Sequence, residues 1–305
     1  MKTFLIAGYA ALLSTVLCAN SHAALTYKPN EPMEGASLET YKTVGNLPLH
    51  INVFYPKDHH AGEKRAAIVF FFGGGWVSGS PSQFLHQCQH FASVGMVAMT
   101  CDYRVSSRNH TTPIEAVADA KSAIRWARAN ANRLGIDPDK IVAAGGSAGG
   151  HLAACCGVID GLDDSIDDLS VSSKPNAMML FNPALDLGPD GFSNKVLIAR
   201  ALEISPLQHV KQGQPPTIVF HGKADTTVPY KQAVEFADAM KKAGNRCEVD
   251  GFEGQKHGFF NFKEPDGGEI YAQVIAKADQ FLLSLGYITA VTPATSGVEA
   301  NKESK

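Results

Sequence analysis

Hydrophobic and polar positions along the chain alternate between two kinds of pattern. Short, continuously apolar runs indicate strands that are covered on both faces, as in a parallel sheet. These runs lie at 66–72, 96–101, 141–144, 177–182, 217–220 and 247–249. Apolar residues recur at helical spacing within 113–134, 230–243 and 269–285. Strands that alternate with helices predict an α/β fold built on a mostly parallel sheet.

Three other segments have patterns of their own. From Leu38 to Tyr55 the residues alternate around a Gly45-Asn46 turn, which predicts two antiparallel edge strands. The acidic, Ser-rich segment 160–174 predicts a solvated loop. Residues 183–216 are rich in Pro and Gly, with a short helical pattern around 196–202, and predict a small lid insertion.

A glycine-rich turn at 145–149 follows the apolar run 141–144 and precedes small residues that predict a closely packed helix. It fits the G-x-S-x-G pattern, in which a serine on a sharp strand-to-helix turn exposes its hydroxyl at the carboxyl edge of the sheet. A nucleotide site is the main alternative for such a turn. The dinucleotide fingerprint needs a glycine where Ser147 stands, and a P-loop needs Gly-Lys-Ser/Thr where the chain reads Gly150-His151-Leu152, so both are excluded.

A second glycine run, Gly73-Gly74-Gly75-Trp76, directly follows the apolar run 66–72. Successive glycines destabilise a fold, and a close approach of backbone amides to a ligand would explain them. Acyl transfer needs amide donors for the developing oxyanion, one of them from the residue after the nucleophile. We therefore predict an oxyanion hole made of Gly74, Gly75 and Ala148, with a merely tight turn as the alternative. Trp76 and Tyr103 are candidate walls of the substrate pocket, or else plain core residues.

A serine nucleophile needs an imidazole base, and the base needs an acid to orient it. In this class of fold the chain order is Ser, acid, His. Ser147, Asp225 and His257 follow that order, and each lies after a predicted strand. We predict these three residues as a catalytic triad, and interpret His151 and His221 as structural hydrogen-bonding groups.

Together the motifs resemble the hormone-sensitive-lipase-like and feruloyl-esterase-like branches of the α/β-hydrolase superfamily. The resemblance extends from about 38 to 285 and rests on 73–76, Asp102-Tyr103-Arg104, 145–150, 221–225 and His257-Gly258-Phe259. It implies an α/β-hydrolase fold with helices on both faces of the sheet and a short lid. It also implies ester hydrolysis through an acyl-enzyme, without metal or cofactor. The family's usual His before the glycine triplet, which supports that loop through hydrogen bonds, is Phe72 here.

Length and charge bound the class of protein further. The 305 residues suffice for one catalytic domain, which we assign to 24–287, followed by a tail at 288–305 that we expect to be disordered. The formal net charge of −3 provides no basic field, so we expect no nucleic-acid partner. In Asp102-Tyr103-Arg104, the two charged residues are expected to take part in an ion pair that fixes the loop below the site, with a contact to substrate as the alternative.

Residues 1–23 read as a signal peptide: Lys2, an apolar run from Phe4 to Leu17, and Ser21-His22-Ala23 at the cleavage site. The apolar run is too short for a good membrane span. Cys18 suggests a lipoprotein, but the preceding Leu17 is larger than a lipobox requires. We therefore expect a secreted or periplasmic protein.

Of the six cysteines, Cys18 leaves with the signal peptide. The odd number that remains includes at least one free thiol. We interpret Cys155 and Cys156 as buried thiols acting as small hydrophobes. Because no cysteines and histidines have ligand spacing, we expect no structural zinc.

The substrate is the least determined part of the prediction. An exported esterase with a short lid resembles enzymes that deacylate plant or algal carbohydrates, with acetyl esters of xylan as the leading expectation. A general short-chain carboxylesterase or lipase, a serine peptidase of the same fold and a catalytically inactive binding module are the alternatives. A lipase would want a larger apolar lid, and the peptidases carry a propeller domain, whose blade repeats this sequence lacks. The natural ester and the oligomeric state stay open.

Overall fold

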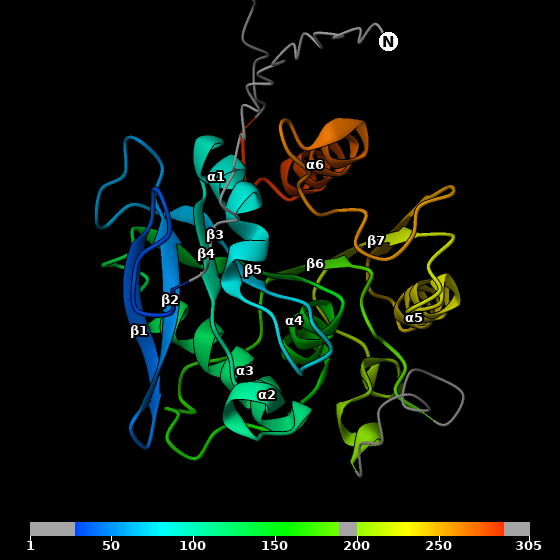
Figure 1. Cartoon of the computed structure of the whole chain (residues 1–305), viewed down its shortest axis with the longest axis horizontal. Helices are drawn as coiled ribbons and strands as arrows, with labels where there is room; N and C mark the ends of the chain where they lie inside the picture. The colour runs from blue at the N-terminus through cyan, green and yellow to red at the C-terminus, as the bar shows by residue number, and fades with distance from the viewer. Residues whose placement is uncertain (1–27, 189–199, 290–305) are drawn as a thin grey trace, which may run out of the picture.

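The computed structural model describes residues 28–188 and 200–289. At its centre is an 8-stranded sheet of order β1-β2-β4-β3-β5-β6-β7-β8 (Figure 1). The first two strands form an antiparallel hairpin and β2 also pairs antiparallel with β4, whereas the other neighbours are parallel. The predicted fold class and edge hairpin are confirmed. The strands are β1 (Ser37–Val44), β2 (Leu47–Phe54), β3 (Arg65–Phe71), β4 (Val97–Cys101), β5 (Ile136–Gly146), β6 (Ala177–Phe181), β7 (Thr217–Gly222) and β8 (Cys247–Phe252).

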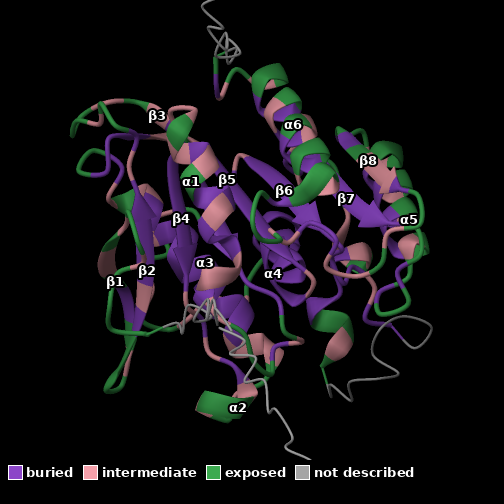
Figure 2. Cartoon of the chain, turned by 45° about the horizontal axis from the view of Figure 1, so that its top comes forward, coloured by how far each residue is buried: buried purple, intermediate pink, exposed green. Residues whose placement is uncertain are grey.

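Helices cover both faces of this sheet. On one face lie α3 (Pro113–Ala129), α4 (Ala148–Val158) and α5 (Tyr230–Lys242); on the other lie α1 (Leu85–Ser93) and α6 (Gly268–Ser284) (Figure 1). Strand β3 explains why both faces must be covered. Val69 and Phe71 belong to the core under α3–α5, whereas Ile68 and Phe70 belong to the core under α1 and α6. Figure 2 accordingly shows the central strands buried between exposed helix surfaces.

Several boundaries differ from the sequence prediction. Strand β5 begins at Ile136, five residues before the apolar run, because Ile136 already pairs with Arg65 of β3; the polar residues 137–140 fall at the register shift before Ile141 pairs with Ala67. Helix α3 ends at Ala129, and the predicted last turn up to Leu134 forms irregular turns instead. Helix α1, the preceding 3₁₀ turn η1 (Pro81–Phe84) and the short α2 (Ser106–Asn109) were not predicted.

The predicted lid lies partly outside the described residues. Its described portion contains two 3₁₀ turns, η3 (Ala201–Ile204) and η4 (Pro206–His209), whereas most of the helical pattern at 196–202 falls in the gap. The predicted signal peptide 1–23 lies outside the described residues, as does the predicted tail 288–305 apart from 288–289.

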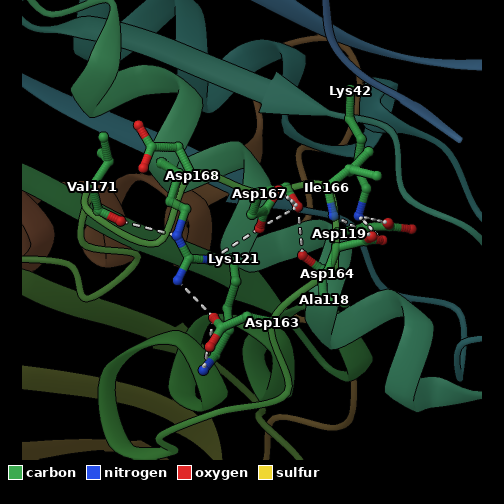
Figure 3. Close-up of polar contacts among 12 residues, drawn as sticks. Lys42, Ala118, Asp119, Lys121, Asp163, Asp164, Ile166, Asp167, Asp168 and Val171 are labelled. Carbon is green, nitrogen blue, oxygen red and sulfur yellow. Dashed lines mark hydrogen bonds and ion pairs between the residues drawn. The ribbon is translucent and has the colours of Figure 1, made fainter.

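The prediction that 160–174 is a solvated loop is wrong in one respect: several of its carboxylates face inward. Figure 3 shows them beside the cations of α3 and β1. Lys42 Nζ, on a side chain 1% exposed, lies 2.7 Å from carboxylates of both Asp119 and Asp164. Arg125 pairs with two further carboxylates of the loop, those of Asp163 and Asp167. A buried cation without a partner is strongly destabilising, so the acidic loop balances the charge that α3 and β1 carry inward.

Candidate active site

The carboxyl ends of the parallel strands meet at one edge of the sheet, which is where α/β proteins place functional groups. The glycine run follows β3, Ser147 follows β5, Asp225 lies three residues beyond β7, and His257 lies in the loop after β8. The fold therefore gathers the residues of the sequence prediction at this edge.

Ser147 occupies the sharp turn between β5 and α4, with φ 54° and ψ −118°. This is a strained conformation for a residue with a side chain, and such strain is common at functional turns. Two backbone bonds hold the turn: the Ser147 N–H donates to Phe181 O at 2.8 Å, and the His151 N–H donates to Ser147 O at 3.0 Å. A Cβ at Gly149 would lie 1.9 Å from the Phe71 carbonyl oxygen, so α4 can pack this closely on β3 only with glycine there.

His257 lies between the two other residues of the predicted triad. Its Nε2 is 2.9 Å from Ser147 Oγ and its Nδ1 is 2.6 Å from Asp225 Oδ2. An ionised carboxylate can only accept, so Nδ1 carries the proton and the lone pair of Nε2 faces the serine hydroxyl. This is the arrangement that a serine nucleophile and its general base require.

Asp225 has hydrogen-bond partners besides His257. Its Oδ1 accepts two backbone N–H groups of the following turn, at 2.8 and 3.0 Å. Its Oδ2 also accepts from Asn182 Nδ2, and His221 Nε2 lies 3.4 Å away. Burial raises the pKa of this carboxyl, but hydrogen bonds from His221, His257 and Asn182 lower it by more, and the pKa falls well below its usual value. Asp225 is therefore ionised at neutral pH.

Sequence reasoning missed Asn182 as a partner of the acid. It follows β6 directly and is fully buried, with φ 42°. The signal that identified Asp225, a polar residue just past the end of a buried strand, was present here too. The interpretation of His221 and His151 as structural groups agrees with their surroundings: both are fully buried, and they hydrogen-bond the carbonyls of Val228 and Ile204, respectively. Burial lowers the pKa of His151 to about 4.

The glycine loop after β3 lies beside the serine turn. Gly74 has φ 122°, and a Cβ there would lie 2.1 Å from the carbonyl oxygen of Ser78. Its own carbonyl accepts the N–H groups of Val77 and Ser78, which closes a tight turn. None of the hydrogen bonds recorded among the described residues uses the N–H of Gly74, Gly75 or Ala148. These three amides therefore have no hydrogen-bond partner among the described residues, and their role as an oxyanion hole stays a prediction.

Phe72, which stands where the resembling families carry a supporting His, is held by packing and by one hydrogen bond. The Tyr103 hydroxyl donates to Phe72 O at 2.7 Å, and the two rings stack with centroids 4.0 Å apart. The guanidinium of Arg108, on α2, lies 5.9 Å from the Phe72 ring centroid. Tyr103 and Trp76 are 1% and 2% exposed, so in this structure neither ring presents surface to a ligand. Tyr103 supports the loop through its bond to Phe72, whereas the Trp76 indole N–H donates to His151 Nδ1 at 3.3 Å; their contact with substrate stays a prediction.

Asp102 and Arg104 both form ion pairs, but with two other residues and not with each other. Asp102 pairs with Arg108 at 2.9 Å. Arg104 donates twice to the buried Asp119, through Nε at 2.8 Å and a terminal nitrogen at 2.7 Å. These pairs anchor the backbone on either side of Tyr103. They thereby hold the Tyr103 side chain, which supports Phe72.

Other expectations concern groups away from the site. The five cysteines from Cys88 to Cys247 are all buried and free, in agreement with the interpretation of Cys155 and Cys156 as small hydrophobes. Within the described ranges, no group of three or more His, Cys, Asp or Glu side chains is placed to hold a metal ion. None of the described helices has the length and apolar character needed to cross a membrane.

The sheet, the strained serine and the hydrogen-bonded row together define an α/β-hydrolase, and comparison with known proteins agrees. Residues 51–189 match the BD-FAE family and residues 176–282 match the prolyl oligopeptidase family. The solved structure of Thermogutta terrifontis esterase 2 phosphoramylated by tabun is 49% identical with a TM-score of 0.82, covering 87% of this chain and 100% of that one. Its propionate-bound form is 48% identical with a TM-score of 0.80, covering 85% of this chain and 97% of that one.

Curated sequences give the same assignment. Esterase LipC of Mycobacterium tuberculosis is 32% identical over 63% of this chain and 52% of its own length. The probable carboxylic ester hydrolase LipM of the same organism is 29% identical over 58% of this chain and 45% of its own. The chain thus spans about half the length of these curated relatives. It belongs to the α/β-hydrolase superfamily, and its relatives there are esterases.

Proposed function

We propose that this protein is a secreted serine esterase that hydrolyses short-chain acyl esters, acetyl esters of carbohydrate in particular, through Ser147, His257 and Asp225. The observation that carries the proposal is the hydrogen-bonded row of these three side chains beside backbone amides that have no hydrogen-bond partner among the described residues. The esterases among its relatives support the reaction class. A binding module that had lost activity would have no need to keep the complete row.

The proposed reaction has two steps. Ser147 Oγ attacks the ester carbonyl while His257 Nε2 accepts its proton, and Asp225 stabilises the imidazolium that forms. The N–H groups of Gly74, Gly75 and Ala148 donate to the oxyanion of the tetrahedral intermediate. His257 then protonates the leaving alkoxide. A water molecule, deprotonated by the same imidazole, attacks the acyl-enzyme and releases the carboxylic acid.

A general short-chain carboxylesterase is the main alternative to a carbohydrate esterase. The relative from Thermogutta terrifontis has been solved with propionate and with butyrate bound, which favours small acyl groups. The carbohydrate proposal is supported by the match to BD-FAE and by 26% identity, over 60% of this chain, to endo-1,4-beta-xylanase B of Butyrivibrio fibrisolvens. The match of residues 176–282 to the prolyl oligopeptidase family keeps a peptidase as a further alternative.

Hydrolysis of nitrophenyl acetate tests the reaction class. We expect the wild-type protein to be active, Ser147→Ala to be inactive, and Ser107→Ala to retain wild-type activity, because Ser107 lies exposed on α2. Equal activity in wild type and Ser147→Ala would refute the proposal. Release of nitroaniline from a peptide nitroanilide, without hydrolysis of the ester, would favour the peptidase.

The substrate class needs a separate measurement. Acetate and ferulate release from natural xylan should be compared with hydrolysis of nitrophenyl butyrate by the same preparation. Acetate release from xylan would support the carbohydrate assignment. If the protein releases neither acid from xylan but hydrolyses the butyrate ester, the general carboxylesterase is the better description.

Export is tested by expressing the full chain in a bacterium. We expect the exported protein to begin at Ala24, after removal of 1–23, when its N-terminus is sequenced. Recovery of uncleaved protein in the cytoplasm alone would contradict the proposed localisation.

A further inference from the structure

Gln83 connects the two loops that the proposed reaction brings together. It lies in η1, between the glycine loop and α1, and is partly buried. Its Oε1 accepts the N–H of Gly73 at 2.6 Å, and its Nε2 donates to Asn261 Oδ1 at 2.9 Å. Asn261 lies four residues after His257, so one side-chain amide spans from the oxyanion loop to the histidine loop.

The direction of each amide group follows from its partners. A backbone N–H can only donate, so Gln83 turns Oε1 toward Gly73 and its NH₂ group toward Asn261. The carbonyl of Gly258 can only accept, and it receives Asn261 Nδ2 at 2.9 Å as well as the Asn261 N–H at 3.1 Å. The remaining pair, Gln83 Nε2 and Asn261 Oδ1, then matches donor to acceptor. The chain of bonds is consistent in one orientation only.

Gly73 is the part of the glycine loop closest to the nucleophile. A Cβ at this position would lie 3.3 Å from Ser147 Cβ and 3.0 Å from the carbonyl oxygen of Gly146. The N–H of Gly73 is occupied by Gln83 and so is not a donor for the oxyanion. It instead fixes the Phe72–Gly73 peptide, one residue before the peptide that carries the Gly74 N–H. Three successive glycines have little conformational preference of their own, so hydrogen bonds must hold their amides in one direction. Val77 and Ser78 hold the Gly74 carbonyl from within the loop, and Gln83 holds the Gly73 N–H from outside it.

Helix α1, which directly follows η1, repeats half of this arrangement. Gln87, four residues later, donates Nε2 to the carbonyl of Phe260 at 3.1 Å. Its Oε1 has no partner among the described residues. Gln87 therefore anchors the histidine loop alone, whereas Gln83 joins that loop to the oxyanion loop.

We propose that Gln83 is a positioning residue: with Asn261 it fixes the oxyanion donors relative to His257, so that the amides and the base act on the same ester carbonyl. The inference rests on the proposed esterase function. Neither residue touches the substrate; both act through the loops they join. A misplacement of catalytic groups by about 1 Å lowers rates by about 100-fold, which sets the scale of the expected effect.

The test compares Gln83→Met with the wild type and with Gln89→Met, a control that changes the same residue type at an exposed position on the adjoining helix α1. Methionine keeps the length of the side chain and removes both hydrogen bonds. Paraoxon, an organophosphate that phosphorylates the esterase of Thermogutta terrifontis, serves to titrate the reactive serine so that kcat is expressed per active site. We expect kcat of Gln83→Met to fall by about 100-fold with KM changed less than about threefold.

A second readout distinguishes positioning from loss of structure. Replacing the carbonyl oxygen of the ester by sulfur weakens the hydrogen bonds to the oxyanion, so the preference for oxygen esters over thionoesters reports on the amide donors. We expect this preference to fall in Gln83→Met and to stay unchanged in Gln89→Met. Partial unfolding would reduce both rates equally and leave the ratio intact.

Asn261→Ala provides an independent test should Gln83→Met fold poorly. If the two residues form one link, the double variant is no worse than the more damaged single variant; independent roles would multiply their effects. A wild-type kcat and a wild-type thionoester ratio in Gln83→Met would overturn the positioning role. Effects of Gln83→Met and Asn261→Ala that multiply in the double variant would overturn the single link. Either result would leave the esterase proposal intact. An inactive wild type would instead overturn the esterase proposal and this inference with it.

Discussion

Replacing Asp225 by Asn tests the proposed role of the acid without changing its shape. Every contact of this carboxylate is with a donor: two backbone N–H groups meet Oδ1, and Asn182, His257 and His221 meet or approach Oδ2. An asparagine must present its own NH₂ group to one of these two sets. Because its oxygen is best retained by the fixed backbone donors, the NH₂ group is expected to face His257.

This exchange reverses the hydrogen bond at the imidazole. His257 Nδ1 would then accept, its proton would move to Nε2, and the atom facing Ser147 at 2.9 Å could no longer act as base. The loss expected from a wrong tautomer is about 10⁴-fold in kcat, or about 5 kcal/mol of transition-state stabilisation. Binding of the ester should be little affected, because Asp225 does not contact it in the proposed mechanism.

The assay is steady-state hydrolysis of nitrophenyl acetate, with thermal unfolding of each variant to verify folding. Asn182→Ala provides the graded comparison: it removes one donor but keeps the carboxylate, so a loss well below that of Asp225→Asn is expected. A folded Asp225→Asn variant that loses less than about tenfold in kcat would refute the assignment of Asp225 as the orienting acid.

Three further predictions concern the surroundings of the site. Asp119→Ala removes the fully buried partner of Lys42 and Arg104 and leaves them only Asp164, so it should reduce the free energy of unfolding by about 3–5 kcal/mol, or the midpoint of thermal unfolding by about 10 °C. The control Asp168→Ala, at an exposed position, should leave both quantities unchanged. Equal shifts for the two variants would contradict this. Tyr103→Phe leaves the Phe72 carbonyl without its donor and should lower the unfolding free energy by about 1–3 kcal/mol in urea titration; an unchanged midpoint would rule out that support. Folding depresses the pKa of Asp225, so the stabilising contribution of this carboxylate is present above about pH 4 and is lost as the pH falls further. The wild type should therefore lose stability below about pH 4 more steeply than Asp225→Asn. Parallel pH profiles of stability for the two proteins would contradict this prediction.

Much of the catalytic edge could be predicted because it follows from local patterns. A continuous apolar run such as 66–72 marks a strand covered on both faces, and the residues directly after such strands lie at the carboxyl edge. Ser147 and the glycine triplet carry their own spacing signals, since only small residues allow the backbone to approach so closely there. Asp225 and His257 needed one more rule, the chain order of the triad.

What the sequence did not reveal depends on contacts between distant segments. Helix α1 is short, and its apolar positions at Leu85, Cys88 and Phe91 are separated by His and Gln, so the helical pattern is weak until the helix packs on the sheet. The link from Gln83 to Asn261 joins residues 178 positions apart, and no local pattern predicts such a partner.

The sequence alone determined the class of fold, the order of its strands along the chain and the residue types at the reactive turns, because these follow from local hydrophobic periods and backbone sterics. Only the tertiary structure decided which polar groups meet. It placed Asn182 and His221 beside Asp225, turned the acidic loop inward to Lys42, and put Tyr103 under the glycine loop. Hydrogen bonds and ion pairs act over a few ångströms in space, and separation along the chain does not encode that distance.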